Sequence, residues 1–425
     1  MDHCAPMATQ KQGTLTIAGT GIASIKHITL ETLSYIEQAD KIHYAVVDPA
    51  TQAFVLEKSK NPQECFDLTD YYDNDKPRYE SYVQMSEVIM KDVRQGYDVL
   101  ALFYGHPGVF VFPSHRAIAI AREEGYSAKM LPGVSAEDYM FSDIGFDPAN
   151  PGCTSQEATA LLVSGRSLDP LVHNIIWQVG GVGVETMIFN NRKFHLLIDR
   201  LERDFGPDQV VIHYIGAVLP QSPTVRDEYT VADLRKEEIV KLISASSTFY
   251  IPPRRLPQLD PEMMRELRGT GVESPLEQAI VAMHCYPRLK WVNDESPSPP
   301  AYGPFEKNAV DNLTTHTIPP RQLFLRSSEA MNQFMKDLAL KPDLRERYKE
   351  DPASVVNVID GLTPEEKFAL SLRHPSPVYR VMRATREGIQ TREGLAVEEL
   401  AETVNQDATI PIICVFGVLV IVVTY

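Results

Sequence analysis

Residues 99–110 read VLALFYGHPGVF, an apolar run that ends in a loop containing Gly105, Pro107 and Gly108. A continuous apolar run bounded by turn residues is typical of a strand that is buried on both faces of a sheet. The two glycines and the proline predict a rigid loop with an open backbone. Because ligands of open α/β sheets bind beyond the carboxyl ends of the strands, this loop is the first candidate for a binding site.

Similar units of strand and turn occur on both sides of this segment. They are residues 15–18 (LTIA) before Gly19-Thr20-Gly21, residues 42–47 (IHYAVV) before Asp48-Pro49, and residues 128–131 (AKML) before Pro132-Gly133. Amphipathic stretches lie between them, and residues 210–215 and 247–251 are later strand candidates. Strands that alternate with helices predict an α/β sheet.

Helical patterns take over beyond residues 252–255 (PPRR). Ser328 is placed to cap a helix whose apolar face would carry Met331, Phe334, Met335 and Leu338. Residues 363–366 (TPEE) combine an N-cap, a proline at the first helical position and a capping-box glutamate. We therefore divide the chain into an α/β domain (1–253), a mostly helical domain (254–384), a linker (385–408) and an apolar tail (409–425).

The composition excludes several classes of protein. The 425 residues carry a formal net charge of -16, which disfavours nucleic acid as a partner because phosphate binding needs clustered basic side chains. The five cysteines are scattered without a C-x-x-C pair, so we expect neither a disulfide framework nor a metal site. The N-terminal residues lack the pattern of a signal peptide, and we expect the protein in the cytosol.

Residues 410–425 (IPIICVFGVLVIVVTY) form the most unusual segment of the sequence. As a helix they would span about 24 Å at 1.5 Å per residue, short of the roughly 30 Å of a membrane core. Pro411 and Gly417 would shorten such a helix, and no Lys or Arg flanks it. β-branched residues prefer extended structure and need an apolar groove to cover them. We therefore favour a core strand or an enzyme's peptide substrate over a membrane anchor.

Residues 19–24 (GTGIAS) are one residue short of the dinucleotide-binding fingerprint. Asp48 follows the second strand, where an acid could bind a ribose. A tight turn between strand and helix explains the glycines equally well, so a nicotinamide-dependent enzyme stays open as an alternative. His106 has no second His or acidic residue at metal-ligand spacing, and we interpret it as a residue that shapes its loop.

Several motifs together resemble a known family. Residues 15–22 (LTIAGTGI), 103–110 (FYGHPGVF) and 131–138 (LPGVSAED) resemble, in this order, the motifs of the tetrapyrrole methylase-like methyltransferases. Further segments are similar to those of the borosins, the fungal autocatalytic peptide α-N-methyltransferases: DYYDN at 70–74 with Arg78 and Tyr82, HYI at 213–215, and STFYIPP at 247–253. The resemblance also covers LTPEEKFAL at 362–370 and the apolar tail.

The resemblance implies a function, a cofactor and partners. S-adenosylmethionine would methylate successive backbone amides of the chain's own tail and leave S-adenosylhomocysteine. Such proteins form interlocked homodimers in which a helical clasp embraces the partner and each tail enters the partner's site. A downstream protease or cyclase would release the peptide, with no nucleic acid or membrane involved. Tails of the family commonly carry a short polar follower after the apolar core, whereas this sequence ends at Tyr425.

The resemblance also assigns site residues. The catalytic set would be Tyr72, Arg78, Tyr82 and Tyr104. The cofactor would contact Gly105, His106, Val109, Phe110, Ser135, Ala136, Gln178, Tyr214, Ala217 and Thr248. The methyl acceptors would lie between Ile412 and Val423, among them Ile412, Ile413, Val415, Gly417, Val418, Leu419, Val420, Ile421 and Val422.

These residue types suit the chemistry of an amide nitrogen, whose lone pair is delocalised into the carbonyl. Tyr82 or Tyr72 would remove the proton, since a phenol near a guanidinium can be held partly as phenolate. Arg78 would stabilise negative charge on the amide oxygen, and Tyr104 would position the amide. Apart from the resemblance, the tyrosines could equally be surface aromatics and Arg78 a solvated charge.

Other functions stay open on the sequence. The first is a methyltransferase of a small, tetrapyrrole-like molecule whose tail is structural or anchors the protein to a membrane. The second is a membrane-tethered binding protein with a degenerate nucleotide fold. The third is the nicotinamide-dependent dehydrogenase.

Overall fold

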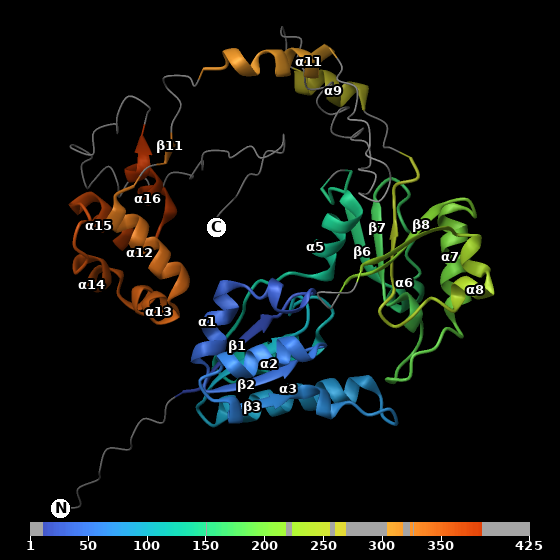
Figure 1. Cartoon of the computed structure of the whole chain (residues 1–425), viewed down its shortest axis with the longest axis horizontal. Coiled ribbons are helices and arrows are strands. Elements are labelled where there is room, and N and C mark those ends of the chain that lie inside the picture. The colour runs from blue at the N-terminus through green and yellow to red at the C-terminus, as the bar shows by residue number, and fades with distance from the viewer. Residues whose placement is uncertain are drawn as a thin grey trace, which may run out of the picture. The chain divides into compact units, whose positions relative to one another are not determined.

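The computed structural model describes residues 12–149, 151–217, 223–255, 260–268, 304–317, 324–325 and 327–384. The chain forms two compact units, Met1–Pro299 and Pro300–Tyr425, which are coloured from blue to yellow and from orange to red in Figure 1. The domain boundary predicted from the sequence lies earlier, at residue 253. The predicted linker (385–408) and tail (409–425) lie outside the described residues.

The first sheet is parallel and has the strand order β3-β2-β4-β1-β5. Its strands are β1 (Thr14–Gly19), β2 (Lys41–Ala45), β3 (Cys65–Asp67), β4 (Asp98–Phe103) and β5 (Ser127–Met130). Four of them coincide with the predicted strands. The short edge strand β3 was missed, because its three half-buried or exposed residues carry no apolar run.

Helices cover both faces of this sheet. They are α1 (Leu30–Gln38), α2 (Pro49–Lys58), α3 (Arg78–Arg94) and α4 (Phe112–Glu123). Side chains at alternate positions of β4 point to opposite faces: Val99 and Phe103 join a core with α3 and α4, whereas Leu100 joins one with α1 and α2. The apolar run at 99–103 is therefore buried on both sides, as predicted.

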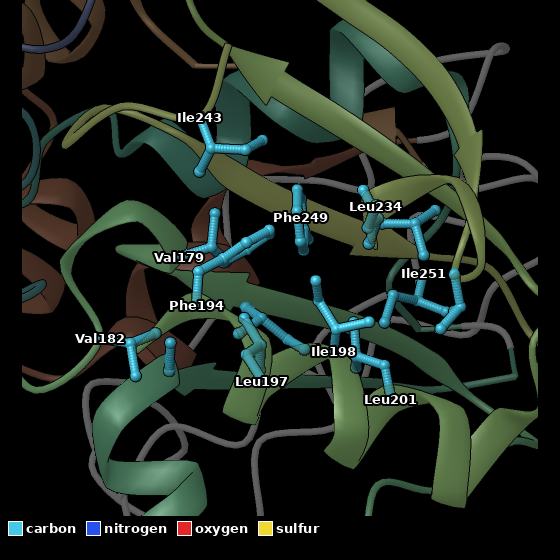
Figure 2. Close-up of a cluster of buried hydrophobic side chains, with 14 of the residues drawn as sticks. Val179, Val182, Phe194, Leu197, Ile198, Leu201, Leu234, Ile243, Phe249 and Ile251 are labelled. Carbon is cyan, nitrogen blue, oxygen red and sulfur yellow. The ribbon is translucent and has the colours of Figure 1, made fainter. Parts of the chain in front are cut away.

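The second sheet has the strand order β6-β7-β10-β8-β9 and is mostly antiparallel. Its strands are β6 (Cys153–Glu157), β7 (His173–Trp177), β8 (Val210–Ile215), β9 (Val225–Thr230) and β10 (Thr248–Ile251). Helices α6 (Ala158–Ser164) and α7 (Phe194–Phe205) cover one face. Figure 2 shows the apolar side chains of α7, including Phe194 and Leu201, directed toward Phe249 and Ile251.

The other face of this sheet packs against α5 (Ala136–Met140) and a π-helical turn, η4 (Phe141–Gly145). Short elements complete the first unit: η1 (Ser24–His27), η2 (Pro62–Glu64), η3 (Leu68–Tyr71), η5 (Val179–Gly181), η6 (Asp233–Arg235), α8 (Glu237–Val240) and α9 (Pro261–Arg268).

The described part of the second unit is mostly helical. It contains α11 (Pro304–Asp311), η7 (Leu313–Thr315), α12 (Glu329–Leu340), α13 (Pro342–Glu350), α14 (Pro352–Asn357), α15 (Pro364–Ser371), α16 (Pro375–Met382) and a two-stranded ladder of β11 (Phe324–Leu325) with β12 (Arg383–Ala384). Met331 and Phe334 of α12 are buried as predicted, whereas Met335 is 41% exposed and lies off the apolar face.

Both predicted helix caps are confirmed, and one residue joins them. The Ser328 hydroxyl accepts a hydrogen bond from the Met331 N–H at the start of α12, and Thr363 forms a capping box with Glu366 at the start of α15. Glu366 is 1% exposed and also accepts a hydrogen bond from the Ser328 hydroxyl at 2.9 Å. One buried carboxylate therefore holds the first turns of two helices together.

Candidate active site

The carboxyl ends of β1 and β4 meet at the centre of the first sheet, where the connections of the chain diverge. The connection that follows β1 crosses β4 to reach β2, and the connection that follows β4 crosses β1 in the opposite direction to reach β5. A place where two neighbouring strands connect in opposite directions is a topological switch point, and open α/β sheets bind ligands there. Two backbone hydrogen bonds join the loops there: the Gly21 N–H donates to the Gly105 carbonyl at 3.2 Å, and the Gly105 N–H to the Gly21 carbonyl at 3.0 Å.

Glycines let three loops approach one another at this point. A Cβ on Gly19 would lie 2.1 Å from the carbonyl oxygen of Gly105, and one on Gly133 would lie 3.6 Å from the Cα of Gly19. Gly21 and Gly105 have φ angles of +74° and +75°, which L-residues rarely adopt. The loops after β1, β4 and β5 therefore meet through close backbone contacts, and we call this cluster the glycine cradle (Gly19, Gly21, Gly105 and Gly133).

His106 shapes the loop after β4. Its Nδ1 accepts a hydrogen bond from the Gly108 N–H at 3.0 Å, and its carbonyl accepts one from the Val109 N–H at 3.1 Å. The hydroxyl of Ser114 also donates to the carbonyl of Pro107. These bonds agree with the interpretation of His106 as a loop-shaping residue and keep Val109 beside the glycine cradle.

Phe110 and Gln178 are two of the predicted cofactor residues, and both have left-handed backbone conformations. Their φ angles are +56° and +54°, which cost free energy in a residue with a Cβ and often mark functional sites. The ring of Phe110 is 53% exposed and lies 5.6 Å from the ring of Trp177, the residue before Gln178. The loop after β4 and the end of β7 thus lie side by side.

Tyr214, Ala217 and Thr248 come from the second sheet. Tyr214 of β8 pairs with Thr248 of β10 in the ladder, and both are buried. A Cβ on Gly216, next to Ala217, would lie 3.4 Å from the Ile22 side chain in the loop after β1. The end of β8 therefore lies against the glycine cradle.

Ser135 and Ala136 begin helix α5, directly after the loop that carries Gly133. The Ser135 hydroxyl accepts hydrogen bonds from the N–H groups of Glu137 and Asp138, and the Asp138 carboxylate accepts one from the Ser135 N–H. This capping box orders the start of the helix beside the cradle.

Tyr104 lies between β4 and Gly105, so its position follows from the same strand. Burial and the nearby negative charge of Asp48 raise the pKa of Tyr104 to about 12. A phenol with this pKa is a neutral hydrogen-bond donor near pH 7. Burial and a hydrogen bond to Asp143 at 2.7 Å likewise raise the pKa of Tyr214.

Tyr72, Arg78 and Tyr82 lie together at the start of α3. The rings of Tyr72 and Tyr82 are 6.3 Å apart. Arg78 donates through its side chain to the Val184 carbonyl at 2.6 Å and stacks on the Phe189 ring at 5.1 Å. One of its five N–H groups is thus committed to holding the start of α3 against the segment after β7.

The structure does not support the prediction that Arg78 holds Tyr72 partly as a phenolate. Arg78 lowers the pKa of Tyr72, but burial and the neighbouring Tyr82 raise it more, and the result is a pKa of about 12. An opposite charge favours the ionised form only where desolvation is weaker. Tyr72 is therefore a neutral phenol near pH 7.

Phe112 connects the two groups of residues. It follows Phe110 by two positions, and its ring lies 6.4 Å from that of Tyr82 and 5.3 Å from that of Tyr79. Tyr79 and Phe112 are 63% and 41% exposed. An aromatic surface thus runs from the predicted catalytic residues to the loop after β4.

The dinucleotide interpretation of residues 19–24 is wrong for this loop. The N–H groups of Ile22 and Ala23 donate to Nδ1 of His27, both at 3.2 Å, and are not free to bind a pyrophosphate. The helical turn that follows is only four residues long. Asp48 caps α2 through the Thr51 N–H and accepts a hydrogen bond from the Ser24 hydroxyl, both at 2.9 Å, so its role is structural.

Some residues of the site could not be found from sequence. His27 orders the loop after β1, and Asp143 binds Tyr214 across 71 positions of the chain. No spacing signal connects residues as distant as Asp143 and Tyr214. In the described ranges, no group of His, Cys, Asp and Glu side chains is placed to hold a metal ion, and no helix of these ranges is long and apolar enough to cross a membrane.

Two family models match the chain. Residues 14–218 match the tetrapyrrole (corrin/porphyrin) methylases, and residues 301–425 match the borosin biosynthesis clasp domain. Among solved structures, a uroporphyrin-III-C-methyltransferase from Thermus thermophilus is similar at 18% identity and a TM-score of 0.40, over 58% of this chain and 98% of its own. The expected α/β methylase-like domain and helical clasp domain are thereby confirmed.

Full-length relatives are also similar. A protein of Cerrena unicolor described as a methyltransferase and ribosomally synthesized type I borosin cyclic peptide precursor is 58% identical, over 95% of this chain and 97% of its own length. A protein of Mycena rosella with the same description is 53% identical over 97% of this chain and 100% of its own length. A type II precursor of Phlebiopsis gigantea is 50% identical over 90% of this chain and 68% of its own length.

Proposed function

Because the chain belongs to the borosin family of methyltransferases and cyclic peptide precursors, we propose that it methylates backbone amides of its own C-terminal tail, with S-adenosylmethionine as the methyl donor. Membership of this family makes the chain a methyltransferase. The proposal concerns the donor, the acceptor nitrogens at 412–423 and the repetition of the transfer along the tail.

The observation that carries the proposal is the cluster of Tyr72, Arg78 and Tyr82, which the ring of Phe112 joins to the loop after β4. A cluster of phenols and a guanidinium suits an acceptor that must lose a proton, and glycines at the ends of β1 and β4 allow a ligand to approach the backbone closely. The clasp-domain match also extends through residue 425, so the apolar tail belongs to a segment that the family shares.

The residues at the cradle fit S-adenosylmethionine. Gly105 and Gly133 leave backbone without side chains, while the half-exposed ring of Phe110, supported by Trp177, offers an aromatic face to an apolar or cationic group. We propose that the predicted cofactor residues from Gly105 to Thr248 hold it there. When bound, it supplies an electrophilic methyl group.

The chain's own residues would then activate the amide. Tyr72 and Tyr104, with pKa values of about 12, act as neutral donors that orient the peptide. Tyr82, after losing its own hydroxyl proton to solvent, would take the proton of the amide nitrogen. The guanidinium of Arg78 stabilises the negative charge that forms on the amide oxygen, in the manner of an oxyanion hole.

We further propose that the protein acts as a homodimer in which each tail enters the partner's site. The helical unit would serve as the clasp, in line with the family description of residues 301–425. Relatives are described as cyclic peptide precursors, which supports a later release and cyclisation of the tail by a protease or cyclase. Pro411 has no N–H and cannot accept a methyl group.

The test is mass spectrometry of the full-length protein incubated with S-adenosylmethionine. The C-terminal tryptic fragment should gain a ladder of CH₂ increments, and fragmentation should place them on backbone nitrogens between Ile412 and Val423. A parallel incubation with S-adenosylhomocysteine controls for methylation acquired during expression. A tail that stays unmodified while the donor binds would instead indicate a methyltransferase of a small molecule.

A further inference from the structure

His213 lies buried in the middle of the second sheet and makes a specific polar contact. It is 1% exposed, and its Nε2 lies 2.7 Å from the Ser247 hydroxyl. On the neighbouring strand β9, its direct cross-strand partner is Asp227, whose carboxylate lies 3.7 Å from Nδ1 of His213. The hydrogen bond at Nε2 therefore orients the buried ring.

Ser247, the hydrogen-bond partner of His213, is the last residue of a tight turn (244–247). Its hydroxyl accepts a hydrogen bond from the Ser244 N–H at 2.9 Å, and its own N–H donates to the Ser244 carbonyl at 3.1 Å. The hydrogen bond with His213 therefore holds in place a turn that two hydrogen bonds between Ser244 and Ser247 already close. The turn leads directly into Thr248, one of the predicted cofactor residues.

The same turn holds the segment after β7. The Ser247 carbonyl accepts a hydrogen bond from the Val179 N–H at 3.2 Å, and a Cβ on Gly180 would lie 2.1 Å from the Ser244 carbonyl oxygen. Figure 2 shows Val179 in one buried cluster with Ile243 and Phe249, which lie on either side of the turn. The segment 179–180 is thus locked to the turn by a hydrogen bond and by close contact.

Gln178 immediately precedes this locked segment and has the left-handed conformation, with φ +54° and ψ +38°. For a residue with a Cβ, this conformation persists only where its surroundings impose it. The contacts of Val179 and Gly180 with the turn supply that restraint. They leave the Gln178 side chain in a defined position next to Trp177 and the loop after β4.

We infer that His213 is a positioning residue for the methyl donor: through Ser247 it holds the 244–247 turn and so sets the backbone of Gln178. This inference rests on the proposed function, because it assigns Gln178 to the donor site. His213 itself does not touch the reacting atoms. It acts by fixing a turn to which both Gln178 and Thr248 are attached.

The charges around His213 agree with a positioning role. Burial lowers the pKa of His213, against the smaller opposing effect of Asp227. Facing groups are Asp227, Tyr229, whose pKa is raised by burial and by Asp227, and the Ser247 hydroxyl. A neutral ring can accept the Ser247 hydroxyl proton at Nε2, while the Asp227 carboxylate at 3.7 Å lies beyond hydrogen-bond distance of Nδ1.

The experiment measures S-adenosylhomocysteine binding to the full-length protein by calorimetry. His213→Leu and Ser247→Ala should each weaken binding about tenfold, equivalent to ~1.4 kcal/mol. His213→Gln, whose amide can reach the Ser247 hydroxyl, should restore most of the affinity. In the Gln178→Ala background the His213→Leu change should lose most of its effect, because residues that act through one another are not additive.

Hydrogen exchange of the protein without ligand supplies a second measurement. His213→Leu should speed exchange of the Val179 amide, which donates to Ser247. Val211→Ala on the same strand, buried but outside the relay, is the control for general loosening, and Ser246→Ala is the control within the turn.

The results distinguish failure of the positioning role from failure of the proposed function. If the wild-type protein binds S-adenosylhomocysteine and His213→Leu binds it equally well, the positioning role is refuted while the proposed function stands. The same holds if Val211→Ala weakens binding as much as His213→Leu. If the wild-type protein does not bind the ligand at all, the proposed function fails and the positioning role fails with it.

Discussion

Gly19→Ala tests whether the glycine cradle is the methyl-donor site. The new Cβ would lie 2.1 Å from the carbonyl oxygen of Gly105, whereas real Cβ contacts below 3.0 Å are essentially never seen. The loops after β1 and β4 must therefore move apart by about 1 Å, a shift beyond the tolerance of well-positioned sites. That shift strains both hydrogen bonds between Gly21 and Gly105.

The expected cost can be separated into stability and binding. Overpacking of this kind destabilises a protein by ~1–3 kcal/mol. The affinity for S-adenosylhomocysteine should fall by about tenfold or more, or at least ~1.4 kcal/mol, because three loops of the cradle share the displaced backbone. Urea unfolding measures the first effect, and calorimetric titration of the folded protein measures the second.

Gly125→Ala is the matched control. Gly125 has a φ angle of +84° and nothing within 4 Å of its Cβ position, at the turn between α4 and β5. Alanine there should cost ~1–2 kcal/mol of backbone strain without changing ligand affinity. Equal affinity of wild type, Gly19→Ala and Gly125→Ala would refute the assignment of the cradle as the donor site.

Three further predictions follow from single contacts. Tyr82→Phe should abolish the methylation ladder in mass spectrometry and leave S-adenosylhomocysteine affinity unchanged; a full ladder would exclude Tyr82 as the base. Burial lowers the pKa of both His27 and His213 below 6.5, so below that pH the unfolded chain binds more protons than the folded protein. The free energy of unfolding should therefore fall as the pH drops below 6.5. Urea unfolding at pH 5 and 7 measures this fall, and His213→Gln should reduce it. Glu366→Gln should destabilise the helical unit by ~1–3 kcal/mol, because buried groups at the first turns of α12 and α15 lose the carboxylate as their hydrogen-bond partner. The control Glu329→Gln, at an exposed position, should not destabilise it. Equal urea midpoints for the two variants would contradict the role of Glu366.

The parts of the fold that sequence predicted are those with local signals. Strands β1 and β4 are apolar runs followed by glycines, and both helix caps of the second unit are short polar motifs. Strands β6 (CTSQE) and β9 (VRDEYT) were missed because their residues are largely polar. Their strand structure comes from pairing with β7 and β8, to which long-range contacts bring them.

The residues of the candidate site likewise fall into those with a local sequence signal and those without one. Residues of the loop after β4 could be placed because a parallel sheet puts its strand ends at one edge. Asp48 was misinterpreted because a helix cap and a ribose-binding acid occupy the same position after a strand, and only the hydrogen bonds to Ser24 and Thr51 distinguish them. The relay from His213 to Gln178 joins three elements that no spacing in the sequence connects.

In the proposed reaction, the three tyrosines of the catalytic set would have different roles. A general base must lose its proton readily, whereas a group that orients the peptide must keep it. Burial, together with Tyr82 for Tyr72 and Asp48 for Tyr104, raises the pKa of both phenols to about 12, which would suit them to the second role. We propose Tyr82 as the residue that takes the amide proton; it lies in the first turns of α3, the helix whose start Arg78 anchors to Val184. In this proposal Arg78 would stabilise the deprotonated amide from one helical turn before Tyr82, on the same face of α3.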